Sequence, residues 1–140
     1  MSAAVLDTSA LIALFRGHLG VASASRTLDR IVLPAVALGE LLVGRMGPAR
    51  VQGSGRAGAG GLRAIGEFLA SPRVEVAVLG AETAERYALI REHLRGAGRP
   101  VPANDIWIAA SAMEMGLRVL TLDSHYLAIP QVVVDLFDPE

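Results

Sequence analysis

The stretch RPVPANDIWIAA, residues 99–110, combines an extended entry with an abrupt helix start. Each of its two prolines disfavours the α conformation in the residue before it, so the chain enters this stretch extended. Asn104 is a residue type that caps a first helical turn, and an apolar run follows at once. Asp105 then shares a helix face with apolar residues, although the helix dipole alone would also favour an acid there.

Length and composition favour one globular domain over residues 1–140. The chain is 52% hydrophobic and 19% charged, and its formal net charge of -1 does not indicate nucleic-acid binding without a local site. All 13 basic residues are arginine, and the absence of cysteine excludes disulfides and thiolate sites. We expect a cytoplasmic protein, since Asp7 interrupts the first apolar run and no run is long enough for a membrane span.

Short apolar runs alternate with segments of helical spacing along the chain. The expected strands cover residues 3–6, 31–33, 74–78, 118–122 and 132–134. The expected helices cover residues 10–15, 21–28, 35–45, 62–69, 80–95 and 105–115. This alternation predicts an α/β fold whose parallel sheet is covered on both faces, with ligands binding beyond the carboxyl ends of the strands.

Residues 47–61 are rich in glycine and predict a flexible connection within the domain. The surrounding segment 45–63 contains four arginines and no acid. Arg45, Arg50 and Arg56 are therefore candidate contacts for substrate phosphates. A solvated surface loop has the same composition, and we favour that interpretation.

Four acidic residues stand out by position. Asp7 and Asp123 follow two expected strands, while Glu40 and Asp105 lie on apolar faces of expected helices. A carboxylate on such a face is costly unless it is paired or metal-bound, although Glu40 at the edge of its stripe would reach solvent. Acids converging on one sheet edge are tolerable around a hard cation such as Mg²⁺, which activates a bound water for displacement at phosphorus.

Polar side chains flank these acids in the sequence. The candidates to orient metal ligands or waters are Thr8, Ser9, Asn104 and Ser124. His125, two residues beyond Asp123, is a candidate phosphate contact, although a structural role beside the site is the simpler interpretation. Trp107 is expected in the core or in a dimer interface rather than as a platform for base stacking.

Four segments resemble the PIN-domain ribonucleases, and most closely the VapC toxins of type II toxin–antitoxin systems. In family order, they are VLDTSAL at 5–11, GELLVG at 39–44, NDIWIAA at 104–110 and TLDSHY at 121–126. The resemblance implies a three-layer α/β/α fold with a five-stranded parallel sheet of order 3-2-1-4-5. It thereby puts the strands before Asp7 and Asp123 side by side. The glycine-rich residues 47–61 depart from the family, which has a more helical segment there.

The same resemblance implies cleavage of RNA phosphodiester bonds with Mg²⁺ or Mn²⁺ as cofactor. The catalytic acids of the family map onto Asp7, Glu40, Asp105 and Asp123. The expected metal ligands are Asp7, Asp105 and Asp123, and the family's early hydroxyl maps onto Thr8 or Ser9. The resemblance also implies a homodimer and a small antitoxin partner. We expect that partner to insert an arginine among the acids and to dock on apolar surface of the early helices, around Leu11, Ile12 and Leu14 or around Leu41 and Leu42.

Other function classes fit part of the pattern. A phosphoacceptor signalling domain would have paired acids after the first strand and a lysine near the end, whereas this chain has a lone Asp7 and no lysine. A haloacid-dehalogenase-type phosphatase needs a second acid where Ser9 stands. A PIN-like protein that binds RNA without cleaving it stays open, although four intact acids argue against it. The apolar residues of helix 84–95, such as Tyr87 and Ile90, also favour a homodimer.

Overall fold

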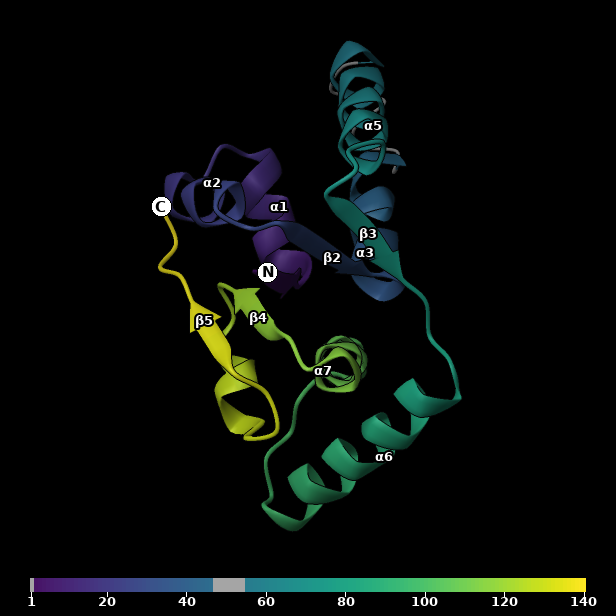
Figure 1. Cartoon of the computed structure of the whole chain (residues 1–140), viewed down its shortest axis with the longest axis vertical. Coiled ribbons are helices and arrows are strands. Elements are labelled where there is room, and N and C mark those ends of the chain that lie inside the picture. The colour runs from purple at the N-terminus through teal and green to yellow at the C-terminus, as the bar shows by residue number, and fades with distance from the viewer. Residues whose placement is uncertain (1, 47–54) are drawn as a thin grey trace.

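Five short strands form one parallel sheet at the centre of the computed structural model, which describes residues 2–46 and 55–140 (Figure 1). The strands are β1 (Ala3–Leu6), β2 (Arg30–Pro34), β3 (Val74–Ala77), β4 (Arg118–Thr121) and β5 (Val134–Leu136). Their order in the sheet is β3-β2-β1-β4-β5. The predicted order 3-2-1-4-5 is therefore confirmed.

Six α-helices and one short 3-10 helix accompany the strands in the described residues. They are α1 (Thr8–Phe15), α2 (Leu19–Arg26), α3 (Ala35–Met46), α5 (Gly55–Leu69), α6 (Ala81–Gly96), α7 (Ala103–Met115) and η1 (Ser124–Ala128). None of the helices in the described ranges is both long and apolar enough to cross a membrane.

Alternate strand residues point to opposite faces of the sheet and build two separate hydrophobic cores. In β1, Val5 joins the core beneath α6 and α7, whereas Ala4 and Leu6 join the core beneath α1 and α2. In β4, Val119 and Leu120 divide in the same way. Helices therefore cover both faces, as the three-layer α/β/α prediction requires.

Most boundaries differ from the sequence-based expectations by one or two residues, and three differences bear on earlier predictions. Helix α5 begins at Gly55, so the prediction of a flexible connection as far as residue 61 is wrong for its second part. Helix α7 begins at Ala103, directly after Pro102, so the prediction of Asn104 as its cap is also wrong. The last strand lies at Val134–Leu136 rather than at 132–134, because its register pairs Val134 with Val119 of β4.

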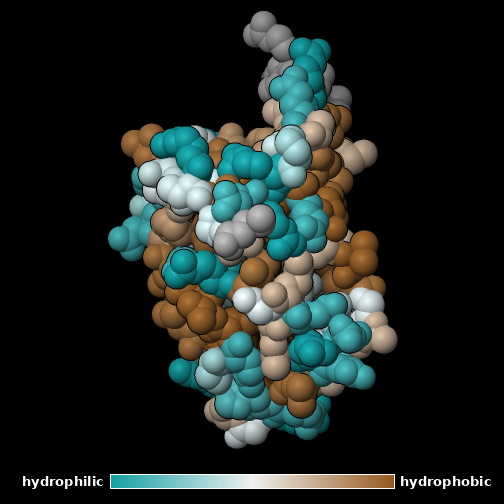
Figure 2. All heavy atoms as spheres, in the orientation of Figure 1, coloured by the Kyte–Doolittle hydropathy of each residue, from teal (hydrophilic) through white to brown (hydrophobic). Residues whose placement is uncertain are grey.

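Two apolar residues of helix α6 pack inside the chain. Ile90 is fully buried, and the ring of Tyr87 stacks on that of Trp107 in α7 with centroids 4.1 Å apart. Neither residue is therefore free to offer the dimer surface predicted for it, whereas Leu89 of the same helix is exposed. Further exposed apolar side chains lie near the β3 edge, at Val76, Val78 and Leu79. Figure 2 shows apolar residues on that flank and a mainly hydrophilic surface over α6.

The centre of the sheet places two acidic residues beside each other. Strands β1 and β4 are neighbours, with Leu6 paired to Leu120. Asp7 follows β1 directly, and Asp123 lies two residues beyond the end of β4. Both acids therefore lie at the carboxyl edge of the sheet, where the strand order reverses.

Candidate metal centre

Asp7 is the most buried acid of the described residues, with 2% of its surface exposed. It caps helix α1, where its Oδ1 accepts a hydrogen bond from the backbone N–H of Ala10 at 2.8 Å. Ser9 Oγ donates to the same Oδ1 at 2.8 Å, and Thr121 Oγ1 donates to Oδ2 at 2.6 Å. Burial raises the pKa of Asp7 to about 6, while these hydrogen bonds lower it and the charge of Asp105 adds to the rise.

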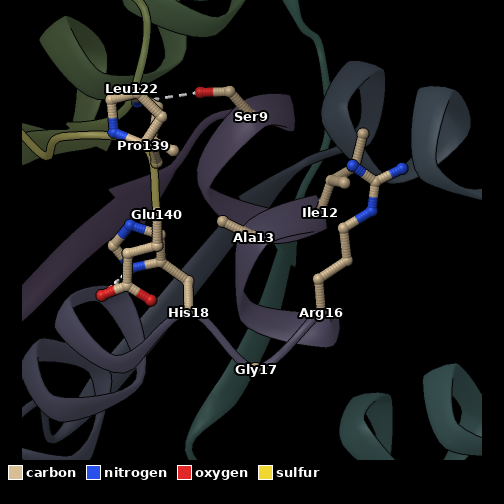
Figure 3. A pocket seen from close by; sticks show the side chains of 9 residues that line it. All are labelled: Ser9, Ile12, Ala13, Arg16, Gly17, His18, Leu122, Pro139 and Glu140. Atoms are coloured by element: carbon tan, nitrogen blue, oxygen red, sulfur yellow. Dashed lines mark hydrogen bonds and ion pairs between the residues drawn. The ribbon is translucent and has the colours of Figure 1, made fainter.

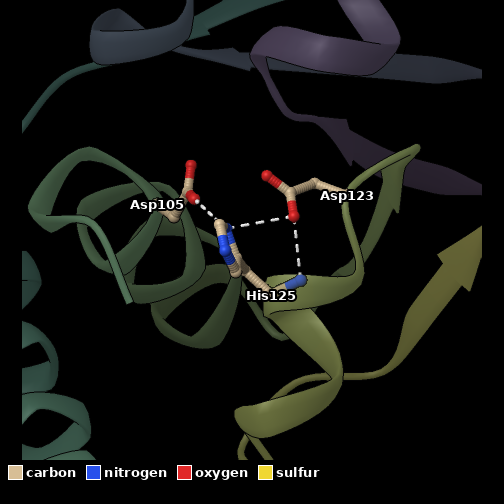
Figure 4. A group of neighbouring side chains, drawn as sticks. All are labelled: Asp105, Asp123 and His125. Carbon is tan, nitrogen blue, oxygen red and sulfur yellow. Dashed lines mark hydrogen bonds and ion pairs between the residues drawn. The ribbon is translucent and has the colours of Figure 1, made fainter. Parts of the chain in front are cut away.

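Asp105, Asp123 and His125 form a second group of possible ligands (Figure 4). Asp105 comes from the first turn of α7, and the other two lie after β4. Nδ1 of His125 lies 3.0 Å from Oδ1 of Asp123 and 3.3 Å from Oδ2 of Asp105. One ligand atom from each of the three residues lies within 4.8 Å of the others. Burial, followed by the charge of Asp123, raises the pKa of Asp105.

The buried side chain of Tyr126 interacts with both groups of acids. Its side chain is fully buried, and its hydroxyl donates to Oδ1 of Asp105 at 3.4 Å. Burial raises the pKa of this phenol far above its usual range, and the charges of Asp7, Asp105 and Asp123 raise it further. The phenol therefore stays protonated, donates to Asp105 and lies within the electrostatic influence of all three carboxylates.

Glu40 lies apart from these acids, on an exposed turn of α3. Its Oε1 accepts a hydrogen bond from Thr8 Oγ1 at 2.5 Å. Thr8 directly follows Asp7, so α1 holds Glu40 near the carboxyl edge of the sheet without burying it. The prediction that Glu40 faces the core is wrong, and the alternative of an acid at the solvent edge of its stripe is what the structure shows.

The four polar side chains predicted to orient metal ligands or waters form two pairs, of which one contacts acids and the other does not. Thr8 and Ser9 hydrogen-bond to acids, and Ser9 Oγ also accepts from the backbone N–H of Leu122 at 2.9 Å. Asn104 and Ser124 are exposed, and within residues 2–46 and 55–140 their side chains make no hydrogen bond to an acid. Thr121 is a site residue that was not predicted from the sequence. Its Oγ1 donates to Asp7 and accepts from the N–H of Asp123 at 2.9 Å.

Of the three arginines predicted to contact phosphates, the structure describes the side chain of Arg45, which makes no hydrogen bond or ion pair with the acids in the described part of the chain. Arg45 lies in the last turn of α3, where its side chain packs against Gly61 of α5. Its Nε is buried and has no hydrogen-bond partner among the residues described. Arg50 and the side chain of Arg56 lie outside the described residues.

A hollow of about 430 Å³ extends from Ser9 along α1 to His18 (Figure 3). Ile12 and Arg16 line it on the helix side. His18 is buried at the start of α2, where its Nδ1 accepts from the N–H of Val21. Its Nε2 lies 2.7 Å from the carbonyl oxygen of Asp138, so the chain end packs against this hollow.

The donor set fits a hard divalent cation. Such ions prefer carboxylate oxygens and keep several waters, and this edge presents the carboxylates of Asp7, Asp105 and Asp123. Burial is the main cause of the raised pKa values of Asp7 and Asp105, and a bound cation would favour their charged forms. The imidazole of His125 lies between two of the acids, so it either joins the ligands or turns away when an ion binds.

Known proteins resemble this chain in sequence and in structure. Residues 4–131 match the PIN domain family. Ribonuclease VapC5 of Mycobacterium tuberculosis is 32% identical over 130 residues, covering 91% of this chain and 88% of the relative. Ribonuclease VapC4 of the same organism is 37% identical over 99 residues, or 71% of each chain.

Two solved toxin–antitoxin structures extend the likeness to the fold. The VapBC-5 structure from Mycobacterium tuberculosis superimposes with a TM-score of 0.73 at 31% identity, covering 99% of this chain and 100% of the other. VapBC2 from Rickettsia felis gives a TM-score of 0.80 at 20% identity, covering 97% and 99% of the two chains. The chain therefore belongs to the PIN domain family, where it groups with the VapC proteins.

Proposed function

We propose that the chain is a Mg²⁺- or Mn²⁺-dependent ribonuclease and acts in the cytoplasm as the toxin of a toxin–antitoxin pair. The observation that supports this most is the set of three carboxylates whose charges act on the buried hydroxyl of Tyr126, at the switch point of the sheet. The names of the VapC relatives support the choice of RNA as substrate.

Asp7, Asp105 and Asp123 would hold the ion in this proposal. When bound, the ion supplies an acidified water and positive charge for an in-line displacement at phosphorus. Ser9 and Thr121 fix both oxygens of Asp7, and Tyr126 orients Asp105 by its hydrogen bond.

We assign Glu40 the proton-accepting role in this reaction. Glu40 is the exposed carboxylate of the set, and Thr8 orients it. An exposed acid exchanges protons with solvent readily, whereas Asp7 is closed in by its hydrogen bonds. His125 stays a candidate phosphate contact, because 48% of its side chain is exposed.

The proposal includes an antitoxin whose arginine would bind the acids by charge-assisted hydrogen bonds. Leu11 and Leu41 are core residues, so the apolar docking surface expected around them is reduced to their partly buried neighbours. The hollow that extends from Ser9 past Ile12 begins beside the acids, and we propose that the antitoxin segment binds there. The VapBC-5 structure is that of a member of a family of toxin–antitoxin systems, which supports an antitoxin as the partner.

We also propose a homodimer. The apolar side chains of Val76, Val78 and Leu79 near β3 are exposed in the single chain. Exposed apolar patches of this kind occur at protein interfaces. Val43 and Met46 of α3 are exposed as well, at 72% and 67%.

The test is cleavage of RNA by the wild type and by Asp105→Asn, with Mg²⁺ or with chelator. We expect the variant to lose at least roughly 100-fold in rate, because it removes one charged metal ligand. Mg²⁺ should also raise the melting temperature of the wild type and not that of the variant. Asp29→Asn is the matched control, since Asp29 is an exposed acid outside the carboxyl edge.

Equal cleavage by the wild type and Asp105→Asn at the same metal concentration would contradict the metal centre. RNA binding by a wild-type protein that never cleaves would instead favour the alternative of a non-catalytic RNA-binding protein.

A further inference from the structure

Two hollows beside the metal centre are lined by arginine. The first, of about 300 Å³, lies between Arg99 and His125. The second, of about 260 Å³, is lined by Arg91, Arg95 and Arg99. Both share Arg99 and the two residues that follow it, so this short loop forms the ridge between them. His125 lines the first hollow and also contacts Asp105 of the metal centre, which makes the hollows continuous with that site.

The end of helix α6 holds Arg99 on this ridge. Gly98 adopts a left-handed conformation with φ of 67°, and its N–H donates to the carbonyl oxygen of Arg95. The N–H of Arg99 donates to the carbonyl oxygen of Leu94 at 3.0 Å. These two bonds are those of a Schellman motif, which turns the chain sharply back against the helix end. Arg99 thus stays beside the last turns of α6.

The charges of these three arginines are available to a ligand. Arg91 donates to the neutral hydroxyl of Tyr87 at 3.1 Å. Arg95 pairs with Glu92 at 3.0 Å, but their side chains are 71% and 66% exposed, and a pair this exposed contributes little. The Arg99 side chain is exposed and has no hydrogen bond or ion pair within the part of the chain that the structure describes.

A polyanion that reaches the metal centre needs a positively charged surface beside it. The carboxylates of the metal centre repel phosphates except where a bound cation offsets their charge, and the net charge of the whole chain is -1, so the strand beyond the centre needs positive side chains of its own. The walls of the first hollow also include Val101 and Leu127, whose apolar side chains a base can contact. A positively charged groove is what tracks the backbone of a single-stranded nucleic acid.

We propose that the two hollows bind single-stranded RNA on one side of the bond to be cleaved. The strand leaves the metal centre past His125, crosses Arg99, and follows Arg95 and Arg91 along the end of α6. Arg99 is the central phosphate contact, because it lines both hollows. This inference rests on the proposed function for its choice of RNA, and it assigns phosphate binding to arginines other than Arg45, which packs between helices.

The test measures binding of a fluorescein-labelled, mixed-sequence RNA of about 12 nucleotides by anisotropy, in an Asp7→Asn background that prevents cleavage. We expect Arg99→Ala to weaken binding on the order of fivefold at low salt. The slope of log Kd against log salt concentration should fall by roughly 0.7, the value for one phosphate contact on a single strand. Arg91→Ala combined with Arg95→Ala should lower the slope further.

Arg26→Ala is the matched control. Arg26 is an exposed arginine on α2, a helix at the opposite end of the molecule from α6 (Figure 1). Arg26→Ala removes one positive charge, as Arg99→Ala does, and we expect it to change neither the Kd for RNA nor the slope of log Kd against log salt concentration. Equal Kd values and slopes for Arg99→Ala and Arg26→Ala would overturn the proposal. So would an Arg99→Ala variant that retains RNA binding but loses binding of labelled polyglutamate, because the hollows would then bind an acidic protein segment.

A second measurement separates this inference from the proposed function. In the cleaving protein, Arg99→Ala should raise KM and leave the Mg²⁺-induced rise in melting temperature unchanged. Loss of that Mg²⁺ response would show that Arg99 acts through the metal centre and would overturn the proposal. Arginine-dependent RNA binding by a protein that never cleaves RNA would contradict the ribonuclease proposal alone.

Discussion

Asp7→Asn is expected to remove the effect of pH on stability at this site in the metal-free protein. The pKa of Asp7 is about 6 in the folded chain, against an ordinary value of 3.8. Because the folded pKa is the higher one, the native state binds the proton more tightly than the unfolded state does. The stability that this proton gives is fully present below pH 3.8 and is lost as the pH rises through 6.

The size of the effect follows from the two pKa values. Their difference of about 2 units corresponds to about 3 kcal/mol between the ends of this pH window. The wild type should therefore lose about 3 kcal/mol more than Asp7→Asn between pH 4 and pH 8. The asparagine oxygen still accepts from the N–H of Ala10. The hydroxyls of Ser9 and Thr121 can turn to accept from its amide, so the variant keeps most of the local hydrogen bonds.

The assay is urea unfolding of both proteins in chelator at several pH values from 4 to 8. The difference in free energy of unfolding, variant minus wild type, should rise with pH and level off above about pH 7. Asp29→Asn should show no such rise, since Asp29 is exposed. Parallel pH profiles for the wild type and Asp7→Asn would refute the reasoning. Saturating Mg²⁺ should abolish the advantage of the variant, because only the wild-type carboxylate gains from the cation.

Two further substitutions test how the helices support the metal centre. Tyr126→Phe keeps the buried ring but removes the donor to Asp105, so we expect roughly a tenfold loss of Mg²⁺ affinity, measured by titration, with little change in the urea midpoint. Unchanged Mg²⁺ affinity would show that this long bond does not orient the acid. Trp107→Ala removes the ring that stacks on Tyr87 and should cost roughly 2 kcal/mol in urea unfolding, and an unchanged midpoint would contradict the role of this contact.

The sheet could be predicted because its strands are short, apolar and separated by helical segments. Val5 and Val32 point to one face while Leu6 and Leu33 point to the other, so both sides of a strand are apolar and the run is continuous. The start of α5 at Gly55 could not be predicted, because glycine disfavours a helix, whereas the apolar residues of its second half predict the helix from residue 62 onward. Ile65 is buried, and Phe68 contacts the Phe15 ring edge-on at 5.3 Å.

The acids could be predicted from their places after strands and on helices, but their surroundings could not. The helical period leaves Glu40 at the border of its apolar stripe, and only the packing of α3 decides that it is exposed. Thr121 is the last residue of a buried strand and resembles any strand threonine. Tyr126 resembles an ordinary core aromatic until the fold brings Asp105 to its hydroxyl.

Residues 99–110 place two opposite charges close together in the chain without joining them. Arg99 and Asp105 are six residues apart, a separation at which a flexible loop would let them pair. The two prolines between them keep the segment extended, and Asp105 is carried on the first turn of α7. Asp105 instead contacts His125 and Tyr126, while Arg99 stays on the ridge between the hollows. The segment thus leaves the Asp105 carboxylate for a cation and the Arg99 guanidinium for a phosphate. A ribonuclease of the proposed kind needs both groups side by side.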